Sequence, residues 1–400
     1  MSTAENDFEV WDADNHFYEP VDALTRHLPR QYRGAIEYVE VRGRTKIAVR
    51  NRIVHYIPNP TFEVVAAPGV WEDYFRGRNT DGKSLRELTG EPIRCRAEFR
   101  NPEDRLRLLD QQGIAAAQVF PTLVSLVEER MKDDIELTHA VIHAFNQWLF
   151  DDWSFNFKDR IFPVPVITLP DVEQAVAELE WCLERGARTV LIRPAPVPMV
   201  NGRSISPAAE RFDPFWQRVQ QAGVPVMMHA SDSGYDAYTR AWEGTGDEWL
   251  PFEPTALSLL MDNDSRPIVD TLSALIAHGM FARNPGVRIG VIENGTRWVP
   301  RLLDNLDHVY HKSPRSFAEP PVETFRRHVW VHPFHEDDIP AIASTMGAGH
   351  VLFGSDFPHP EGLREPLSFI GDLAGMAPDD VRRVMGQNLR ELLEPQPVRA

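Results

Sequence analysis

Eight short apolar segments, separated by stretches with helix signals, run through this 400-residue chain. Segments of this kind are typical of strands that are buried on both faces. Because parallel neighbours need a crossover connection, the strand–helix alternation predicts a parallel sheet. Eight such units predict a closed (β/α)8 barrel, with a doubly wound open sheet as the alternative. The predicted strands span residues 8–11, 115–120, 161–167, 188–192, 224–228, 287–292, 328–331 and 351–353.

Two segments interrupt this alternation. Residues 34–70 alternate β-branched and polar residues around turn formers, which predicts a small antiparallel β insertion after strand one. A charged stretch follows it, so the whole insertion spans about 34–100. Residues 231–264, after strand five, form a long polar loop that is either a lid over a site or a contact between subunits. Its aromatic residues are Tyr235, Tyr238, Trp242, Trp249 and Phe252. No linker is evident, so we expect a single barrel domain over residues 1–400.

The composition narrows the class of protein. A net charge of -17 argues against a nucleic-acid partner, because it implies no basic surface. Cys95 and Cys182 lie far apart without a C-x-x-C motif, so neither a disulfide framework nor a cysteine zinc site is expected. The first ten residues lack the apolar core of a signal peptide, and no apolar run is long enough to span a bilayer. We therefore expect a cytoplasmic protein with no nucleic-acid or membrane partner.

Polar and charged residues follow the predicted strands. A charge is rarely buried at the end of a strand unless it is paired or bound to a metal. In a barrel, the carboxyl ends of all strands open onto one face, which is where active sites lie. The candidates are Asp14 and His16 after strand one, Arg193 after strand four, His229 after strand five, Glu293 after strand six, His332 after strand seven and Asp356 after strand eight.

Two of these imidazoles and two of these carboxylates are a sufficient ligand set for one divalent ion such as Zn²⁺, with a water in an open position. Asp14 and His16 face the same side of an extended segment because they are two residues apart. Most candidates also have a structural alternative. These are a polar residue under a loop for His16, a turn cap for Asp356, a core histidine for His229, a helix cap for Glu293, an ion pair for Arg193 and a wet loop for His332 and His335. The repeated strand-end position favours one shared site.

Four motifs carry a family resemblance: D-A-D-N-H-F-Y-E-P at 12–20, P-V-M-M-H at 225–229, I-E-N-G-T-R-W-V-P at 292–300 and F-G-S-D-F-P-H-P-E-G at 353–362. They resemble the amidohydrolase superfamily, in particular the amidohydrolase family 2 branch with aminocarboxymuconate-semialdehyde decarboxylase and resorcylate decarboxylase. The resemblance spans nearly the whole chain and implies a metal-dependent (β/α)8 barrel. It implies that Asp14, His16, His229 and Asp356 are the metal ligands.

The chain departs from that pattern at two places. Many relatives have H-x-H in strand one, where this chain has Asp14 in the first position. Many decarboxylases of the family carry a histidine after strand six, where this chain has Glu293-Asn294-Gly295. That histidine helps to protonate or orient the substrate in those enzymes, so its absence weighs against decarboxylation. Glu293 adds a carboxylate that is either a ligand or a proton acceptor.

The chemistry we expect is hydrolysis with one divalent ion, zinc in the first place and manganese or iron as alternatives. The ion would lower the pKa of a bound water. Asp356 or Glu293 would act as general base and then as acid. Arg193 and His332 would hold an anionic or carbonyl part of the substrate.

The sequence does not decide whether the bond hydrolysed in a small substrate is an amide, an ester or a C–C bond. Non-oxidative decarboxylation of an aromatic or enoic acid is the alternative within enzymes, which would make the chain a lyase. A non-catalytic barrel with a structural metal is the alternative from another class of protein. The resemblance also leads us to expect a homodimer.

Overall fold

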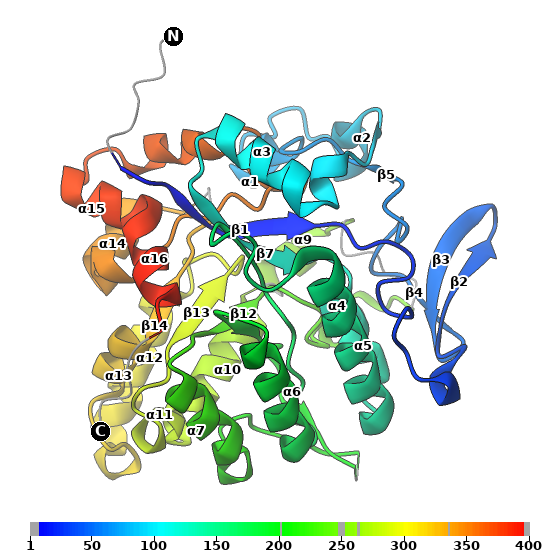
Figure 1. Ribbon diagram of the computed structural model, residues 1–400. Helices are drawn as coiled ribbons and strands as arrows, with labels where there is room; N and C mark the ends of the chain where they lie inside the picture. The colour runs from blue at the N-terminus through cyan, green and yellow to red at the C-terminus, as the bar shows by residue number, and fades with distance from the viewer. Residues whose placement is uncertain (1–7, 201, 247–252, 262–264, 335–336, 396–400) are drawn as a thin grey trace.

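The computed structural model describes residues 8–200, 202–246, 253–261, 265–334 and 337–395 (Figure 1). Its centre is a set of parallel strands, as the sequence predicts. One sheet has the order β1 (Trp11–Phe17), β7 (Ala116–Pro121) and β8 (Ile161–Pro163). The other has the order β14 (Val329–Val331), β13 (Ile289–Ile292), β12 (Val226–His229) and β9 (Val190–Leu191). A single parallel bridge between Val166 and Leu191 connects the two sheets at one side. At the other side, residues 351–357 lie between them, with one parallel bridge from Val351 to Val331 and one from Phe357 to Asn15.

The eight strand segments therefore follow one another around a barrel of α/β type. Helices cover its outside: α3 (Pro102–Gln112), α4 (Val124–Met131), α5 (Ile135–Trp153), α6 (Val172–Glu184), α7 (Asp213–Ala222), α10 (Arg266–Ala277), α11 (Met280–Arg283), α12 (Val299–Lys312), α13 (Pro321–His328), α14 (Ile339–Met346), α15 (Pro378–Arg382) and α16 (Asn388–Leu393). None of the described helices is long and apolar enough to cross a membrane.

Local sequence signals explain where these helices begin and end. The side chain of Asn101 accepts hydrogen bonds from the backbone N–H groups of Glu103 and Asp104, and Pro102 occupies the first turn of α3. The helix ends at Gly113, which has a left-handed backbone (φ 72°). The apolar residues between helices and strands are closely packed, and the side chains of Val226, Met228 and Val291 are fully buried.

The insertion after strand one is antiparallel, as predicted. β2 (Ile36–Val41) pairs with β3 (Arg44–Val49), which pairs with β4 (Arg52–Val54). This hairpin stands out at one side of the barrel (Figure 1). The rest of the insertion contains β5 (Val64–Val65), β6 (Ile93–Arg94), α1 (Glu72–Phe75) and α2 (Leu85–Thr89).

The segment after strand five is more regular than the predicted polar loop. It contains α8 (Asp236–Glu243) and α9 (Ala256–Met261). A separate antiparallel pair, β10 (Val197–Pro198) with β11 (Ser204–Ile205), lies in the connection after strand four. Tyr235 directly precedes α8 and Tyr238 lies within it. Trp249 and Phe252 lie outside the described residues.

The ends of the first and last strands differ from the prediction. Residues 12–16 were expected to follow a strand over 8–11, but β1 runs through them to Phe17, with a register shift between Asp12 and Asn15. The predicted strand ended at residue 11 because the apolar run ends there, whereas the partners of the polar residues that follow are distant in sequence. In the last predicted strand only Val351 forms a bridge, although Leu352 and Phe353 are fully buried.

Candidate metal centre

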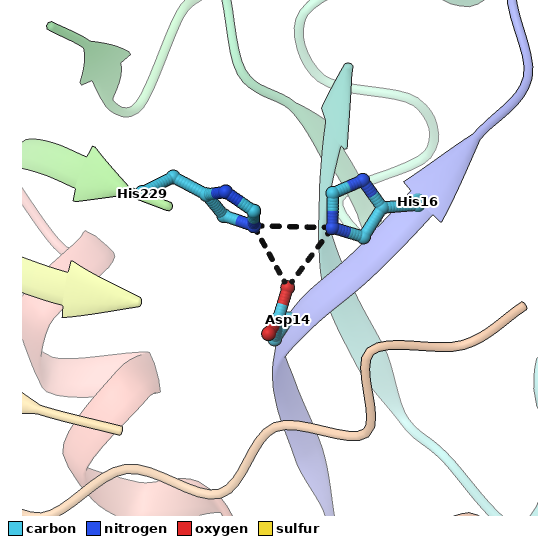
Figure 2. Close-up of side chains that lie close together, drawn as sticks. All are labelled: Asp14, His16 and His229. Carbon is cyan, nitrogen blue, oxygen red and sulfur yellow. Dashed lines mark hydrogen bonds and ion pairs between the residues drawn. The ribbon is translucent and has the colours of Figure 1, made fainter. Parts of the chain in front are cut away.

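Asp14, His16 and His229 meet at the carboxyl end of the barrel strands (Figure 2). The His16 Nε2 atom lies 3.1 Å from His229 Nε2 and 3.3 Å from Asp14 Oδ1. His229 Nε2 lies 3.4 Å from the same Asp14 oxygen. All three residues are at most 4% exposed. They come from β1 and from the last residue of β12, so the barrel itself brings them together.

The hydrogen bonds around His229 orient its ring. Its Nδ1 atom lies 2.8 Å from the carbonyl oxygen of Ala230, which can only accept, so Nδ1 carries the proton of the neutral ring. The Nε2 lone pair therefore points at Asp14 and His16. Burial, with the neighbouring His359, lowers the pKa of His16 well below its usual range, so His16 is neutral.

The separation of these three atoms fits a metal ion. Bonds of about 2.0–2.1 Å in a tetrahedral zinc site place neighbouring ligand atoms about 3.3 Å apart, within the 3.1–3.4 Å range seen here. Lone pairs of a carboxylate and an imidazole repel one another at this range unless a cation lies between them. The residues present thus fit a divalent ion.

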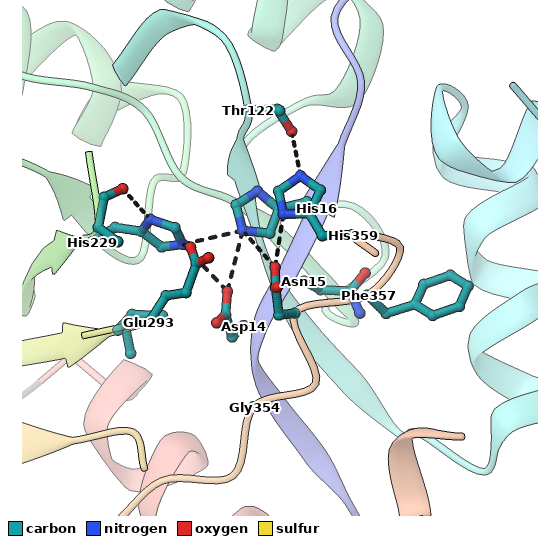
Figure 3. A network of polar contacts seen from close by, with 12 residues as sticks. Asp14, Asn15, His16, Thr122, His229, Glu293, Gly354, Phe357 and His359 are labelled. Atoms are coloured by element: carbon teal, nitrogen blue, oxygen red, sulfur yellow. Dashed lines mark hydrogen bonds and ion pairs between the residues drawn. The ribbon is translucent and has the colours of Figure 1, made fainter. Parts of the chain in front are cut away.

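Asp356 and Glu293 extend this group, and Figure 3 shows Glu293 beside His229. Asp356 Oδ1 lies 3.5 Å from His16 Nε2, and Glu293 Oε2 lies 3.0 Å from His229 Nε2. Both residues have a left-handed backbone, with φ values of 53° and 56°. Such conformations are uncommon outside glycine and cluster at functional sites. Burial and the charges of Glu361 and Asp14 raise the pKa of Asp356 well above its usual range, so a bound cation would favour its ionised form.

The helix-cap alternative for Glu293 does not match its position. The backbone N–H of Thr296, in the turn before α12, donates to Asp337 Oδ2 at 2.7 Å. The Thr296 hydroxyl donates to the same oxygen at 2.8 Å. Asp337 therefore organises this turn, while Glu293 points toward His229.

His332 and Arg193, the two predicted substrate-binding residues, have protein partners. His332 Nε2 donates to the carbonyl of Gly354 at 3.1 Å, and its Nδ1 lies 3.3 Å from Asp14 Oδ2. At 1% exposure, His332 lies behind Asp14. Arg193 pairs with Glu129, and its Nη1 also donates to the carbonyl of Asp232 at 3.2 Å.

Arg193 nevertheless borders open space. A cavity of about 450 Å³ has Arg193, Tyr235 and Arg266 in its wall, a volume in the range of small-molecule sites. A much smaller cavity shares Arg193 with it and reaches His229. Arg193 therefore lies in the wall of both cavities, and His229 lies in the wall of the smaller one.

The sequence prediction omitted two residues of the site, His359 and Glu361. The Nδ1 atom of His359 lies 2.8 Å from Asp356 Oδ1, and the His359 ring packs against the His16 ring at a tilt of 30°, with 4.0 Å between centroids. Glu361 offers a carboxylate oxygen near Asp356 and His359. Their signal was the P-H-P-E sequence directly after the strand-eight aspartate.

A second layer of buried polar residues holds β1 against the last strand segment. Asp12 accepts from Ser355 Oγ at 2.5 Å, from Ser355 N at 2.9 Å and from Asp14 N at 3.0 Å. Arg105 donates to Asn15 Oδ1 and, at 2.7 Å, to the carbonyl of His16. The strand that carries Asp14 and His16 is therefore fixed from behind.

Known proteins share this fold. A model of the family described as amidohydrolase matches residues 12–394. An amidohydrolase from Mycobacterium avium subsp. paratuberculosis K-10 is 40% identical, with a TM-score of 0.91 over 97% of this chain and 99% of that chain. No curated protein sequence matches.

Two more distant structures share the fold alone. One is 2,6-dihydroxybenzoate decarboxylase complexed with 2,6-dihydroxybenzoate, at 16% identity and a TM-score of 0.59 over 97% of this chain and 99% of that chain. The other is 5-carboxyvanillate decarboxylase from Novosphingobium aromaticivorans DSM 12444 with manganese and 4-hydroxy-3-methoxy-5-nitrobenzoic acid, at 16% identity and 0.61 over 98% of each chain. With the family model spanning nearly the whole chain and a 40% identical relative covered almost completely, this protein belongs to the amidohydrolase family of enzymes.

Proposed function

We propose that the protein is a metal-dependent hydrolase of a small carbonyl- or carboxylate-bearing substrate. The observation that carries the proposal is the convergence of Asp14, His16 and His229 on one point, with Asp356 and Glu293 beside it. A divalent ion held there would lower the pKa of a water molecule toward neutrality and polarise a carbonyl group. Zinc is our first choice, with manganese or iron as alternatives.

The chain supplies the proton transfers. Asp356 and Glu293 lie on two sides of the His16–His229 pair, so either carboxylate can take a proton from water and return it to the leaving group. Arg193, in the wall of the neighbouring cavity, would attract a carboxylate or carbonyl of the substrate. The scissile bond is an amide, an ester or a C–C bond.

Decarboxylation is the second candidate, because two structures with this fold are named decarboxylases and one was solved with manganese and a benzoic acid derivative. The charge of the site argues against it. Glu293 Oε2 lies 3.0 Å from His229 Nε2, so a substrate carboxylate on the same ion would approach a second carboxylate. That approach is unfavourable unless Glu293 is protonated.

Turnover in ¹⁸O-labelled water separates the two reactions once screening has found a substrate. Hydrolysis places the heavy isotope in the product, since the water oxygen forms the new bond. Product without the isotope, released together with carbon dioxide, would establish decarboxylation instead. A structural metal without catalysis would be required for folding, so unfolding of the chelator-treated protein with no turnover on any substrate would support that third alternative.

A further inference from the structure

His332, which directly follows β14, contacts the ends of three other strand segments. Its backbone N–H donates to the carbonyl of Val291 at 2.9 Å, which extends the parallel pairing of β14 with β13. Its ring Nε2 donates to the carbonyl of Gly354 at 3.1 Å, and its Nδ1 lies 3.3 Å from Asp14 Oδ2. The residue is 1% exposed, so water does not compete for these contacts.

The side chain of His332 takes the place of a backbone acceptor at the end of this ladder. In a parallel ladder, the residue that donates to Val291 would accept, through its own carbonyl, the backbone N–H of residue 293. Here the N–H of Glu293 donates instead to His332 Nδ1 at 3.3 Å. Glu293 leaves the strand with a φ of 56°, and its N–H keeps a partner as it does so. Such a left-handed backbone is uncommon outside glycine and needs support from its surroundings.

The two partners of the His332 ring fix its tautomer and its orientation. The carbonyl of Gly354 can only accept, so Nε2 carries the proton. The backbone N–H of Glu293 can only donate, so Nδ1 offers its lone pair. Each ring nitrogen of the neutral histidine therefore has a partner of the matching kind.

Close packing and direction connect this ring to the metal centre. A Cβ atom at residue 354 would lie 2.7 Å from His332 Nε2 and 2.8 Å from His332 Cε1, so glycine is what allows this close approach. On the opposite side of the ring, the backbone conformation of Glu293 directs its carboxylate to the site, where Glu293 Oε2 lies 3.0 Å from His229 Nε2. His332 thus holds the residue that turns this carboxylate toward the ligands.

We propose that His332 is a positioning residue, which holds the backbone of Glu293 in its left-handed conformation and thereby keeps the Glu293 carboxylate at the metal centre. The inference rests on the proposed function in one respect, because Glu293 transfers a proton only in that reaction. The sequence predicts that His332 binds substrate. Its contacts with Glu293, Gly354 and Asp14 occupy both ring nitrogens, which favours the positioning role.

Two substitutions of His332 separate the roles of its ring atoms. The amide of a glutamine reaches the place of Nε2 and that of an asparagine the place of Nδ1, so only His332→Asn can keep an acceptor for Glu293. Chelator-stripped full-length protein is titrated with Co²⁺, whose visible absorption reports affinity and coordination. We expect His332→Gln to bind Co²⁺ about 10- to 100-fold more weakly, with a changed spectrum. His332→Asn should keep the wild-type spectrum and lose less affinity.

A double-mutant cycle tests whether the effect passes through Glu293. If it does, the variant with both His332→Gln and Glu293→Ala should bind Co²⁺ within about twofold of Glu293→Ala alone. A loss that reaches the ion through Asp14 would add to that of Glu293→Ala and would overturn the proposal. His328→Gln is the control, because His328 lies before β14, is 3% exposed and has its Nδ1 2.7 Å from the carbonyl of Val287. It should lose stability and keep the wild-type spectrum.

The crystal structure of metal-free His332→Gln measures the backbone directly. We expect residue 293 to leave the left-handed region, and a φ near 56° in this variant would overturn the proposal. Wild-type Co²⁺ affinity in His332→Gln would overturn it as well. If circular dichroism shows that His332→Gln is unfolded, His332→Asn decides, and a loss of affinity as large as that of Glu293→Ala would contradict the proposal. Failure of the hydrolase proposal changes none of these results, because no turnover is measured.

Discussion

The Nε2 atoms of His16 and His229 lie 3.1 Å apart, although 213 residues separate them in the chain. The hydrogen bond from His229 Nδ1 to Ala230 leaves the His229 Nε2 atom as an acceptor. His16 has at most one proton to share among His229, Asp14 and Asp356. A cation bound between these atoms would accept their lone pairs and remove the repulsion among them.

Gly354→Ala should disturb this centre. A Cβ atom at residue 354 would lie 2.6 Å from Asp14 Cβ and 2.7 Å from His332 Nε2, both on closely packed side chains. We expect a loss of about 1–3 kcal/mol in the free energy of unfolding and weaker metal binding. Gly371→Ala is the control, because a Cβ atom there meets nothing within 4 Å. Equal metal affinity in both variants would contradict the close packing of Gly354 against the site.

Glu293→Gln should lower activity and leave stability unchanged, whereas Asp337→Ala should lower stability. We expect Glu293→Gln to abolish most activity with little change in Tm, because its carboxylate points at His229. We expect Asp337→Ala to cost about 1–3 kcal/mol of stability, because it removes the acceptor for Phe334 N, Thr296 N and Thr296 Oγ1. Kinetics and thermal unfolding check both. Full activity in Glu293→Gln would show that this carboxylate has no role in turnover.

Arg105→Lys should weaken metal binding, although Arg105 contacts the strand that carries the ligands and not the ion itself. Arg105 is fully buried and donates to Asn15 and to the carbonyl of His16, and a lysine cannot make both contacts with the same geometry. Second-layer changes of this kind typically cost about 10- to 100-fold in metal affinity. Isothermal titration with Zn²⁺ measures it, with the exposed Arg107→Lys as the control. Unchanged affinity would mean that β1 holds its ligands without this support.

His139 should make the fold sensitive to acid. Burial lowers the pKa of His139 from 6.5 to about 4, and its Nε2 atom accepts from the backbone N–H of Asp171 at 3.1 Å. Because the folded protein binds this proton more weakly than the unfolded chain, the stabilisation is present above pH 6.5 and is lost as the pH falls through 4. We expect about 2 kcal/mol of this loss between pH 7 and pH 5.

Urea unfolding at the two pH values measures the effect. His139→Gln should reduce the difference between pH 7 and pH 5, whereas the exposed His311→Gln should leave it unchanged. The same pH difference in His139→Gln and in the wild type would assign the acid sensitivity to other groups.

The sequence allowed the barrel and the β insertion to be predicted because periodicity and turn residues are local signals. It also placed Asp14, His16, His229 and Asp356 in one region, since every strand of a barrel ends on the same face. It could not place His359, which reaches His16 through a turn after the last strand segment. Nor could it place Arg105, a helix residue whose partners Asn15 and His16 are about 90 positions away.

The amount of tightly bound metal in purified protein is the most direct test of the metal centre formed by Asp14, His16, His229 and Asp356. Elemental analysis after gel filtration should find at least one divalent ion per wild-type chain and a large loss of it in His229→Ala and Asp356→Asn. The exposed His311→Ala should keep the wild-type amount. Undiminished metal in both His229→Ala and Asp356→Asn, or a wild-type chain that binds no divalent ion, would contradict the central claim.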